Sequence, residues 1–113
     1  MILFAPTWNY DKNNFFVNHS SRLIQKLLDK NYSVIFRPHP EHYKRSKNTI
    51  NKINKLFLND KNFFLDKSIS NLKSLEKAEI LITDNSSIVF EFMLIFKRPI
   101  IYIDYREKIH NID

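Results

Sequence analysis

Short apolar runs alternate with segments of helical periodicity along the chain, and this alternation most limits what its 113 residues can fold into. Five runs are typical of strands; they lie at 2–5, 34–36, 62–65, 80–82 and 99–103. Between them, apolar residues recur at helical spacing within 18–30, 41–57, 70–77 and 86–96. Near-continuous apolar strands separated by helices predict a parallel sheet covered on both faces. Because crossovers are right-handed, few topologies remain, and we expect one α/β domain with strand order 3-2-1-4-5.

The chain contains no glycine, and this excludes two common ways of binding phosphate. Both the P-loop and the G-x-G-x-x-G fingerprint need glycine where the backbone approaches the ligand closely. Any phosphate must therefore be held by a helix start and by side chains. Left-handed turn positions must go to Asn or Asp, and the candidates are Asn31, Asn59, Asp60 and Asn85.

The formal net charge of +6 favours an anionic partner, such as a nucleotide, a polyphosphate, a nucleic acid or an acidic lipid surface. A solvated basic face is the alternative. The lysines within 44–55 show no aromatic pattern suited to base stacking, so we expect no nucleic acid partner. The absence of cysteine rules out disulfides and thiolate metal sites and fits a reducing cytosol. His19, His42 and His110 lack the spacing of a metal site, and we expect them at the surface.

The most informative stretch runs from the fourth strand into the helix that follows it. Thr83 to Asn85 form a turn in which Asp84 orients a neighbour or caps, and Ser86 or Ser87 is expected to cap the helix. Because the first N–H groups of a helix have no partner within it, this start is a candidate anion site. The helix is apolar nearly all round and should be buried, yet it carries Glu91, one turn beyond Ser87. That carboxylate could accept two ribose hydroxyls; an ion pair with a nearby cation is the alternative.

Two cation-capable side chains, Arg37 and His39, end the second strand, with two prolines that force an extended exit. Alternation places both on one side. A guanidinium offers phosphate a planar fork of donors, and an imidazole can donate a hydrogen bond or carry a proton. Thr7 and Trp8 follow the first strand, where a loop could touch phosphate or base. All these residues fall at carboxyl ends of strands, where parallel sheets bind ligands. An ordinary loop arginine and a histidine held by the backbone remain the alternative.

Three blocks, taken together, resemble a known family. They are 2–8 (ILFAPTW), 34–40 (VIFRPHP) and 81–92 (LITDNSSIVFEF), followed by 98–102 (RPIIY). In this order they are similar to the CDP-glycerol glycerophosphotransferases, the teichoic acid polymerases and primases of bacterial cell envelopes. The resemblance covers residues 2 to about 105. It implies a Rossmann-like, donor-binding half of a GT-B fold at 1–105, with 106–113 as a tail.

The resemblance also implies roles. His39 would contact the donor phosphates and assist catalysis, Arg37, Thr7, Ser86 and Ser87 would hold phosphate, and Glu91 would hold the ribose. No metal and no cofactor are expected. The donor would be CDP-glycerol or a similar CDP-polyol, and the acceptor a polyol phosphate or lipid-linked polymer. The family usually has an aromatic residue at the position of Asn85 and an arginine at that of Asn9.

We further expect a cytoplasmic protein, peripheral at the inner face of the membrane. In the family an N-terminal half supplies the acceptor site and a second histidine, and we expect that half to be missing here or to be a separate chain. Alone, this chain is expected to bind donor weakly and to transfer nothing. Two alternatives stay open: a nucleotide-sugar glycosyltransferase or epimerase that uses UDP donors, and a non-catalytic remnant of the fold.

Overall fold

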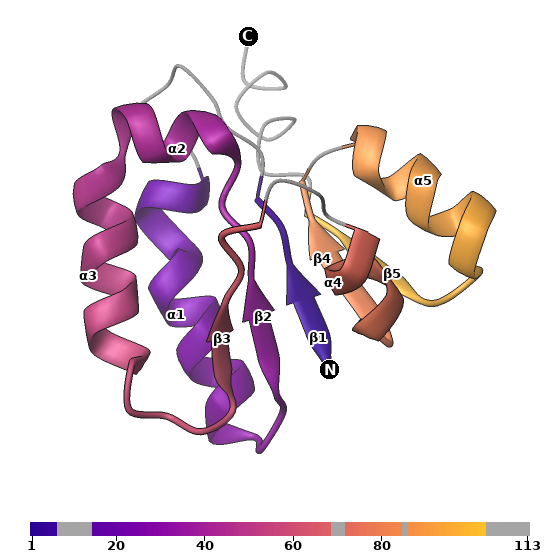
Figure 1. The fold of residues 1–113 in the computed structure, drawn as a ribbon. Coiled ribbons are helices and arrows are strands. Elements are labelled where there is room, and N and C mark those ends of the chain that lie inside the picture. The colour runs from indigo at the N-terminus through magenta and orange to yellow at the C-terminus, as the bar shows by residue number, and fades with distance from the viewer. Residues whose placement is uncertain (7–14, 69–71, 85, 104–113) are drawn as a thin grey trace, which may run out of the picture.

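The protein is a five-stranded parallel sheet with helices on both faces, as the computed structural model shows (Figure 1). The structure describes residues 1–6, 15–68, 72–84 and 86–103. The strand order is β3-β2-β1-β4-β5, which confirms the expected topology. The strands are β1 (Ile2–Phe4), β2 (Val34–Phe36), β3 (Phe63–Leu65), β4 (Ile80–Thr83) and β5 (Ile100–Tyr102).

The helices divide between the two faces of the sheet (Figure 1). They are α1 (Phe15–Asp29), α2 (Pro40–Arg45), α3 (Lys47–Phe57), α4 (Leu72–Lys77) and α5 (Ser86–Phe96). On one face, Ile24 of α1 and Ile53 of α3 pack on Phe4 and Phe36. On the other, Leu75 of α4 and Phe92 of α5 join Leu3, Ile35 and Leu81. Successive strand residues therefore point to opposite cores, which explains why the strands read as continuous apolar runs.

The segment expected as one helix over 41–57 is two helices, which corrects that prediction. Ser46 lies between them with φ −131° and ψ 34°, outside helical geometry. His39 is extended, with φ −64° and ψ 147°, as the neighbouring prolines predict. Pro40, however, starts α2, because the first helical position needs no N–H donor and suits the fixed φ of proline.

Left-handed backbone occurs at Asn31 and Lys97 in the described part of the chain, with φ of 66° and 54°. Asn31 follows α1 and confirms the expected helix end. Asn59 and Asp60 are not left-handed, so those two candidates are wrong, and Asn85 lies outside the described residues. Lys97 takes the position instead, directly after α5, where its N–H donates to the carbonyl of Phe92 at 3.3 Å.

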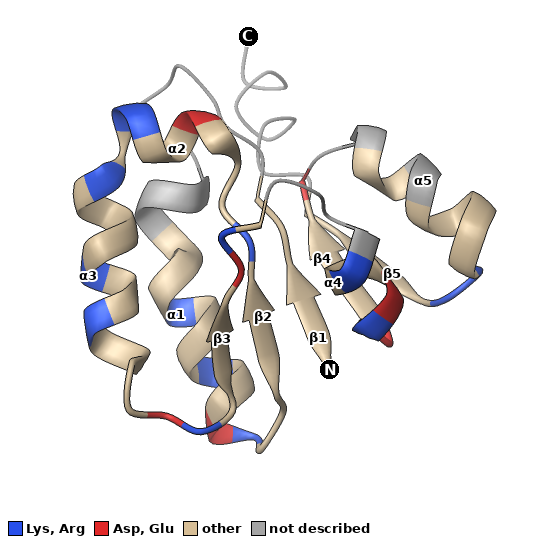
Figure 2. Cartoon of the chain, in the orientation of Figure 1, with Lys and Arg blue, Asp and Glu red and all other residues tan. Residues whose placement is uncertain are grey.

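Helix α5 is not buried all round, contrary to expectation. It packs on the sheet through Ile88 and Phe92, whereas Met93, Leu94 and Ile95 are 54%, 77% and 61% exposed. Figure 2 shows no charged residue along its described part before the basic pair that follows it. The helix packs on one face of the sheet, and a single sheet face can cover only one stripe of a helix.

Candidate functional site

The carboxyl ends of four strands meet at one edge, as the site hypothesis required. Backbone bonds continue the ladder past the strands: the N–H of Ala5 donates to Ile82 at 3.0 Å, that of Arg37 to Phe4 at 2.9 Å and that of Asp66 to Phe36 at 2.9 Å. The buried hydroxyl of Thr83 donates to the carbonyl of Ala5 at 2.6 Å and ties β4 to β1 at this edge. The residues that follow the strands are thus held side by side by main-chain geometry.

Arg37 turns toward the end of β3, where it pairs with Asp66. Its Nη1 lies 2.9 Å from Oδ2 of Asp66 and 3.1 Å from the hydroxyl oxygen of Ser68. The two charged side chains are only 13% and 14% exposed. A nearly buried pair needs every remaining hydrogen-bonding position satisfied to offset the cost of desolvation. The guanidinium expected at a phosphate is therefore also a structural tie between β2 and β3.

The carboxylate of Asp66 gathers further donors on its own side. Its Oδ1 accepts from the Ser68 N–H at 2.9 Å and from the Ser68 hydroxyl, and its Oδ2 accepts from the hydroxyl of Ser74 in α4. Burial by itself would raise the pKa of Asp66, but the hydrogen bonds from Ser68, Ser74 and Arg37 lower the pKa to about 2 from 3.8. We call Arg37, Asp66, Ser68 and Ser74 the Asp66 network.

The stability of the domain should depend on pH through Asp66. Because its pKa is lower in the folded chain than in the unfolded chain, the charged carboxylate stabilises the fold fully at pH above about 5. This contribution should be lost as the pH falls from there through about 2, the folded pKa. Urea unfolding at several pH values measures it. In Asp66→Asn that part of the acid dependence should disappear, and an unchanged slope would contradict the prediction.

His39 is held at the start of α2 by a pair of reciprocal bonds. Its Nδ1 accepts from the N–H of Glu41 at 3.1 Å, while its own N–H donates to Nδ1 of His42 at 2.9 Å. The two rings meet edge to face with centroids 6.2 Å apart. An imidazole whose Nδ1 accepts has its proton on Nε2 when neutral. The alternative stated for His39, a histidine held by the backbone, therefore holds for Nδ1. The other ring nitrogen, Nε2, carries the proton that could be donated to a ligand.

Tyr43, one turn after His39 on α2, brings a phenol close to the Asp66 network. Burial raises the pKa of Tyr43, the charge of Asp66 raises it further, and Arg37 acts in the opposite direction. Within the described residues its buried hydroxyl has no hydrogen-bond partner. Arg37 thus bonds residues that follow β3, whereas the bonds of the His39 ring and N–H stay within α2. Tyr43 lies near enough to Asp66 and Arg37 to feel both charges.

At the predicted anion site, the start of α5, the structure describes the course of the backbone. Ser86 and Ser87 are the first two residues of α5, where N–H groups have no partner within the helix, so they lie inside its first turn rather than before it. Glu91 lies four residues after Ser87 in the same helix. Asp84 is half-buried directly after β4. Thr7, Trp8 and Asn85 lie outside the described residues.

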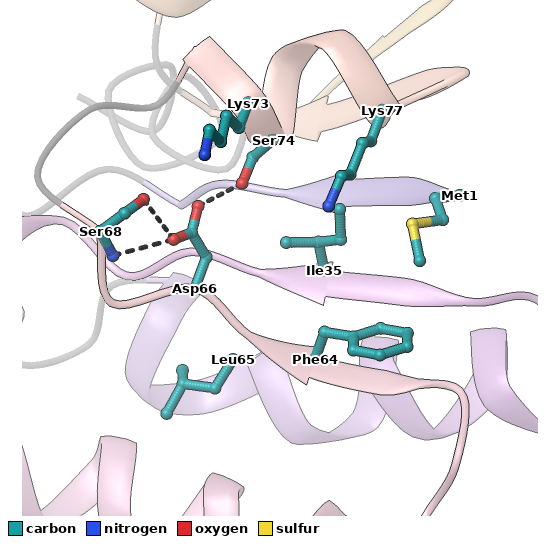
Figure 3. Close-up of a pocket in the computed structure, with 9 residues that line it drawn as sticks. All are labelled: Met1, Ile35, Phe64, Leu65, Asp66, Ser68, Lys73, Ser74 and Lys77. Carbon is teal, nitrogen blue, oxygen red and sulfur yellow. Dashed lines mark hydrogen bonds between the residues drawn. The ribbon is translucent and has the colours of Figure 1, made fainter.

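A cavity of about 290 Å³ opens beside the Asp66 network, on the face of the sheet that carries α4 (Figure 3). Apolar side chains of Ile35, Phe64 and Met1 line it together with Asp66. Figure 3 shows Lys73 and Lys77 extending from α4 over this cavity. Its described lining includes neither Arg37 nor His39, so the cavity is a neighbour of the predicted site and not the site itself.

Sequence analysis missed several residues that the structure brings to this edge. His42 was expected at the surface and is fully buried, which corrects that prediction. Its position three residues after His39 is that of a capping-box partner, a signal that could have found it. Asp66, Ser68 and Ser74 gave no signal, because nothing in their spacing shows that β3 ends beside Arg37.

The described part of the chain holds no group of three or more His, Cys, Asp or Glu side chains that could bind a metal ion. None of its helices combines the length and apolar character that crossing a membrane requires.

The fold and the site together define a Rossmann-like domain of the GT-B type, with its polar residues at the carboxyl edge of the sheet. Comparison with known families then gives the particular class. The family model described as CDP-Glycerol:Poly(glycerophosphate) glycerophosphotransferase matches residues 1–109. The chain belongs to this family, which confirms the resemblance seen in the sequence.

Two solved structures are similar. The wall teichoic acid polymerase TagF is 25% identical with a TM-score of 0.63, over 99% of this chain and 26% of that one. The UDP-GlcNAc 2-epimerase of Methanocaldococcus jannaschii, in complex with UDP-GlcNAc and UDP, is 20% identical with a TM-score of 0.63, over 97% of this chain and 32% of that one. The likeness to the epimerase shows the fold alone. The match to TagF covers about a quarter of the length of that protein. No match is found among curated proteins.

Proposed function

We propose that this chain is the donor-binding domain of a CDP-glycerol glycerophosphotransferase that acts in the synthesis of teichoic acid or a related envelope polymer. The observation that carries the proposal is the family match over residues 1–109, together with the meeting of the family-like blocks at one sheet edge. The net charge of +6 suits a donor that carries a pyrophosphate.

In the proposed reaction an acceptor hydroxyl oxygen attacks the β-phosphorus of CDP-glycerol. A bond forms between that oxygen and phosphorus, the bond from phosphorus to the bridging oxygen breaks, and CMP leaves with the electron pair. The hydroxyl proton passes to solvent or to a base. Such a transfer depends on positioning and on fixed positive charge near the phosphoryl oxygens. The acceptor and the residues that bind it are proposed to come from a further GT-B half.

The residues predicted to bind phosphate and ribose each have a role in this proposal. The first N–H groups of α5, with the hydroxyls of Ser86 and Ser87, hold the pyrophosphate, and Glu91 accepts from the ribose. His39 donates from Nε2 to a phosphate oxygen, since its Nδ1 is already an acceptor. Arg37 contributes positive charge from its place beside Asp66, and Thr7 contacts phosphate from the loop after β1.

Isothermal titration calorimetry with CDP-glycerol, CDP-ribitol and CMP tests the proposal, with UDP-GlcNAc and UMP as a competing panel. We expect the cytidine compounds to bind and the uridine compounds to bind more weakly. Ser86→Ala should weaken CDP-glycerol binding about tenfold, because hydrogen bonds to charged groups contribute roughly 1.5–3 kcal/mol. No cytidine binding by the unchanged protein would overturn the proposal.

A second serine in the chain provides the control. Ser46 also stands at the start of a helix, α3, and makes no side-chain cap bond there. Ser46→Ala should leave the affinity for CDP-glycerol within about twofold of the unchanged protein. An equal loss of affinity in both variants would show that the Ser86 effect does not come from a phosphate contact.

A further inference from the structure

We propose that His42 is the positioning residue for His39: it holds the His39 backbone so that this imidazole keeps one tautomer and one direction, with Nε2–H as the donor to phosphate. His42 itself would touch no ligand. The inference rests on the proposed function for the identity of the phosphate ligand, but not for the geometry of the two histidines.

The reciprocal bonds carry this proposal. Nδ1 of His42 accepts the N–H of His39 at 2.9 Å, and this bond closes the box whose other side is the bond from Glu41 to Nδ1 of His39. The carbonyl of His39 also accepts the N–H of His42 at 2.8 Å. His39 is thus anchored through its N–H, its carbonyl and its ring. Each of these anchors is on α2.

Burial makes His42 suited to this task. The side chain is fully buried, whereas that of His39 is half-buried. A buried ring has few rotamers open to it, and its position is fixed by packing. His42 therefore offers an acceptor at a fixed point, and a box of this kind holds the chain entry into a helix. The fully buried ring thus fixes the backbone of His39, from which the half-buried ring extends.

The arrangement has a chemical consequence for His39. While Nδ1 accepts the Glu41 N–H, a neutral His39 presents only a donor at Nε2 and has no free lone pair for a general base. His39 is then a hydrogen-bond donor to the developing charge on phosphate, and the proton of the acceptor hydroxyl must leave by another route. Without the box, both tautomers become accessible and only one of them can donate at Nε2.

A matched pair of variants isolates the proposed bond. His42→Asn and His42→Leu have nearly the same shape, both remove Nε2, and only Asn keeps an acceptor at the δ position. Nitrogen-detected NMR of the ring of His39 reports its tautomer, and calorimetry reports the affinity for CDP-glycerol. We expect His42→Leu to show both His39 tautomers and about five- to tenfold weaker binding, with His42→Asn within about twofold of the unchanged protein.

The two readouts separate this inference from the proposed function. If the unchanged protein binds no cytidine compound, the proposed function fails, and the His39 tautomer in the two variants still tests the role of His42. A single Nε2–H tautomer in His42→Leu would overturn the inference, whatever binds. Equal losses of affinity in both variants, with the tautomer preserved in both, would likewise overturn it, because packing alone would then explain the effect.

Discussion

Replacing Asp66 with alanine should lower the free energy of unfolding by about 3 kcal/mol. The change leaves the nearly buried guanidinium of Arg37 without its carboxylate and removes the acceptor of the hydroxyls of Ser68 and Ser74. Because these partners come from β2, the loop after β3 and α4, the loss should loosen three elements together. Urea unfolding followed by circular dichroism at pH 7 measures the change.

Two controls show whether the network or a single bond is responsible. Asp66→Asn keeps the size and one acceptor but not the charge, and should cost about half as much as alanine. Asp60 is an exposed loop aspartate whose Oδ1 accepts one N–H, from Asn62 at 2.9 Å, so Asp60→Ala should cost about 0.5 kcal/mol. If Asp60→Ala and Asp66→Ala lower the free energy of unfolding equally, the Asp66 network contributes no more to stability than a single exposed hydrogen bond.

The order of strands in the sheet could be predicted because its physical causes are local. Runs such as Val34 to Phe36 are apolar at every position, which a strand between two helical layers requires. Right-handed crossovers then leave little choice of order. Helix ends were harder, because α2 and α3 read as one amphipathic segment. Ser46 separates them with non-helical backbone, and no proline or glycine within 41–57 marks this break in the sequence.

The structure places the described residues of the predicted site after their strands, and it adds contacts that the sequence did not predict. Arg37 and Asp84 follow their strands at the carboxyl edge as expected, since each directly follows a strand in the printed sequence. The pairing of Arg37 with Asp66 could not be predicted, because it joins residues 29 apart through the register of β2 and β3. The assignment of His42 to the surface failed for another reason: a polar side chain in an amphipathic helix is normally solvated, and here its bond to the N–H of His39 helps to offset burial.

The second large effect we expect concerns His39. Two substitutions of this residue should separate its proposed contact with phosphate from its role as the cap of α2. His39→Asn retains a side-chain acceptor for the Glu41 N–H, because asparagine is among the best helix caps, but it has no imidazole. His39→Ala loses both. We expect the affinity for CDP-glycerol to fall about ten- to hundredfold in both variants, whereas only His39→Ala should lose about 1 kcal/mol of stability.

Calorimetry with CDP-glycerol and urea unfolding, run on the same samples, decide between three outcomes. Weak binding in both variants with stability lost only in alanine assigns the phosphate contact to the ring. Binding that is kept in His39→Asn and lost in His39→Ala would assign the effect to the cap, and the imidazole would then have no part in donor recognition. Unchanged binding in both would remove His39 from the site and leave the start of α5 as the proposed phosphate-binding element.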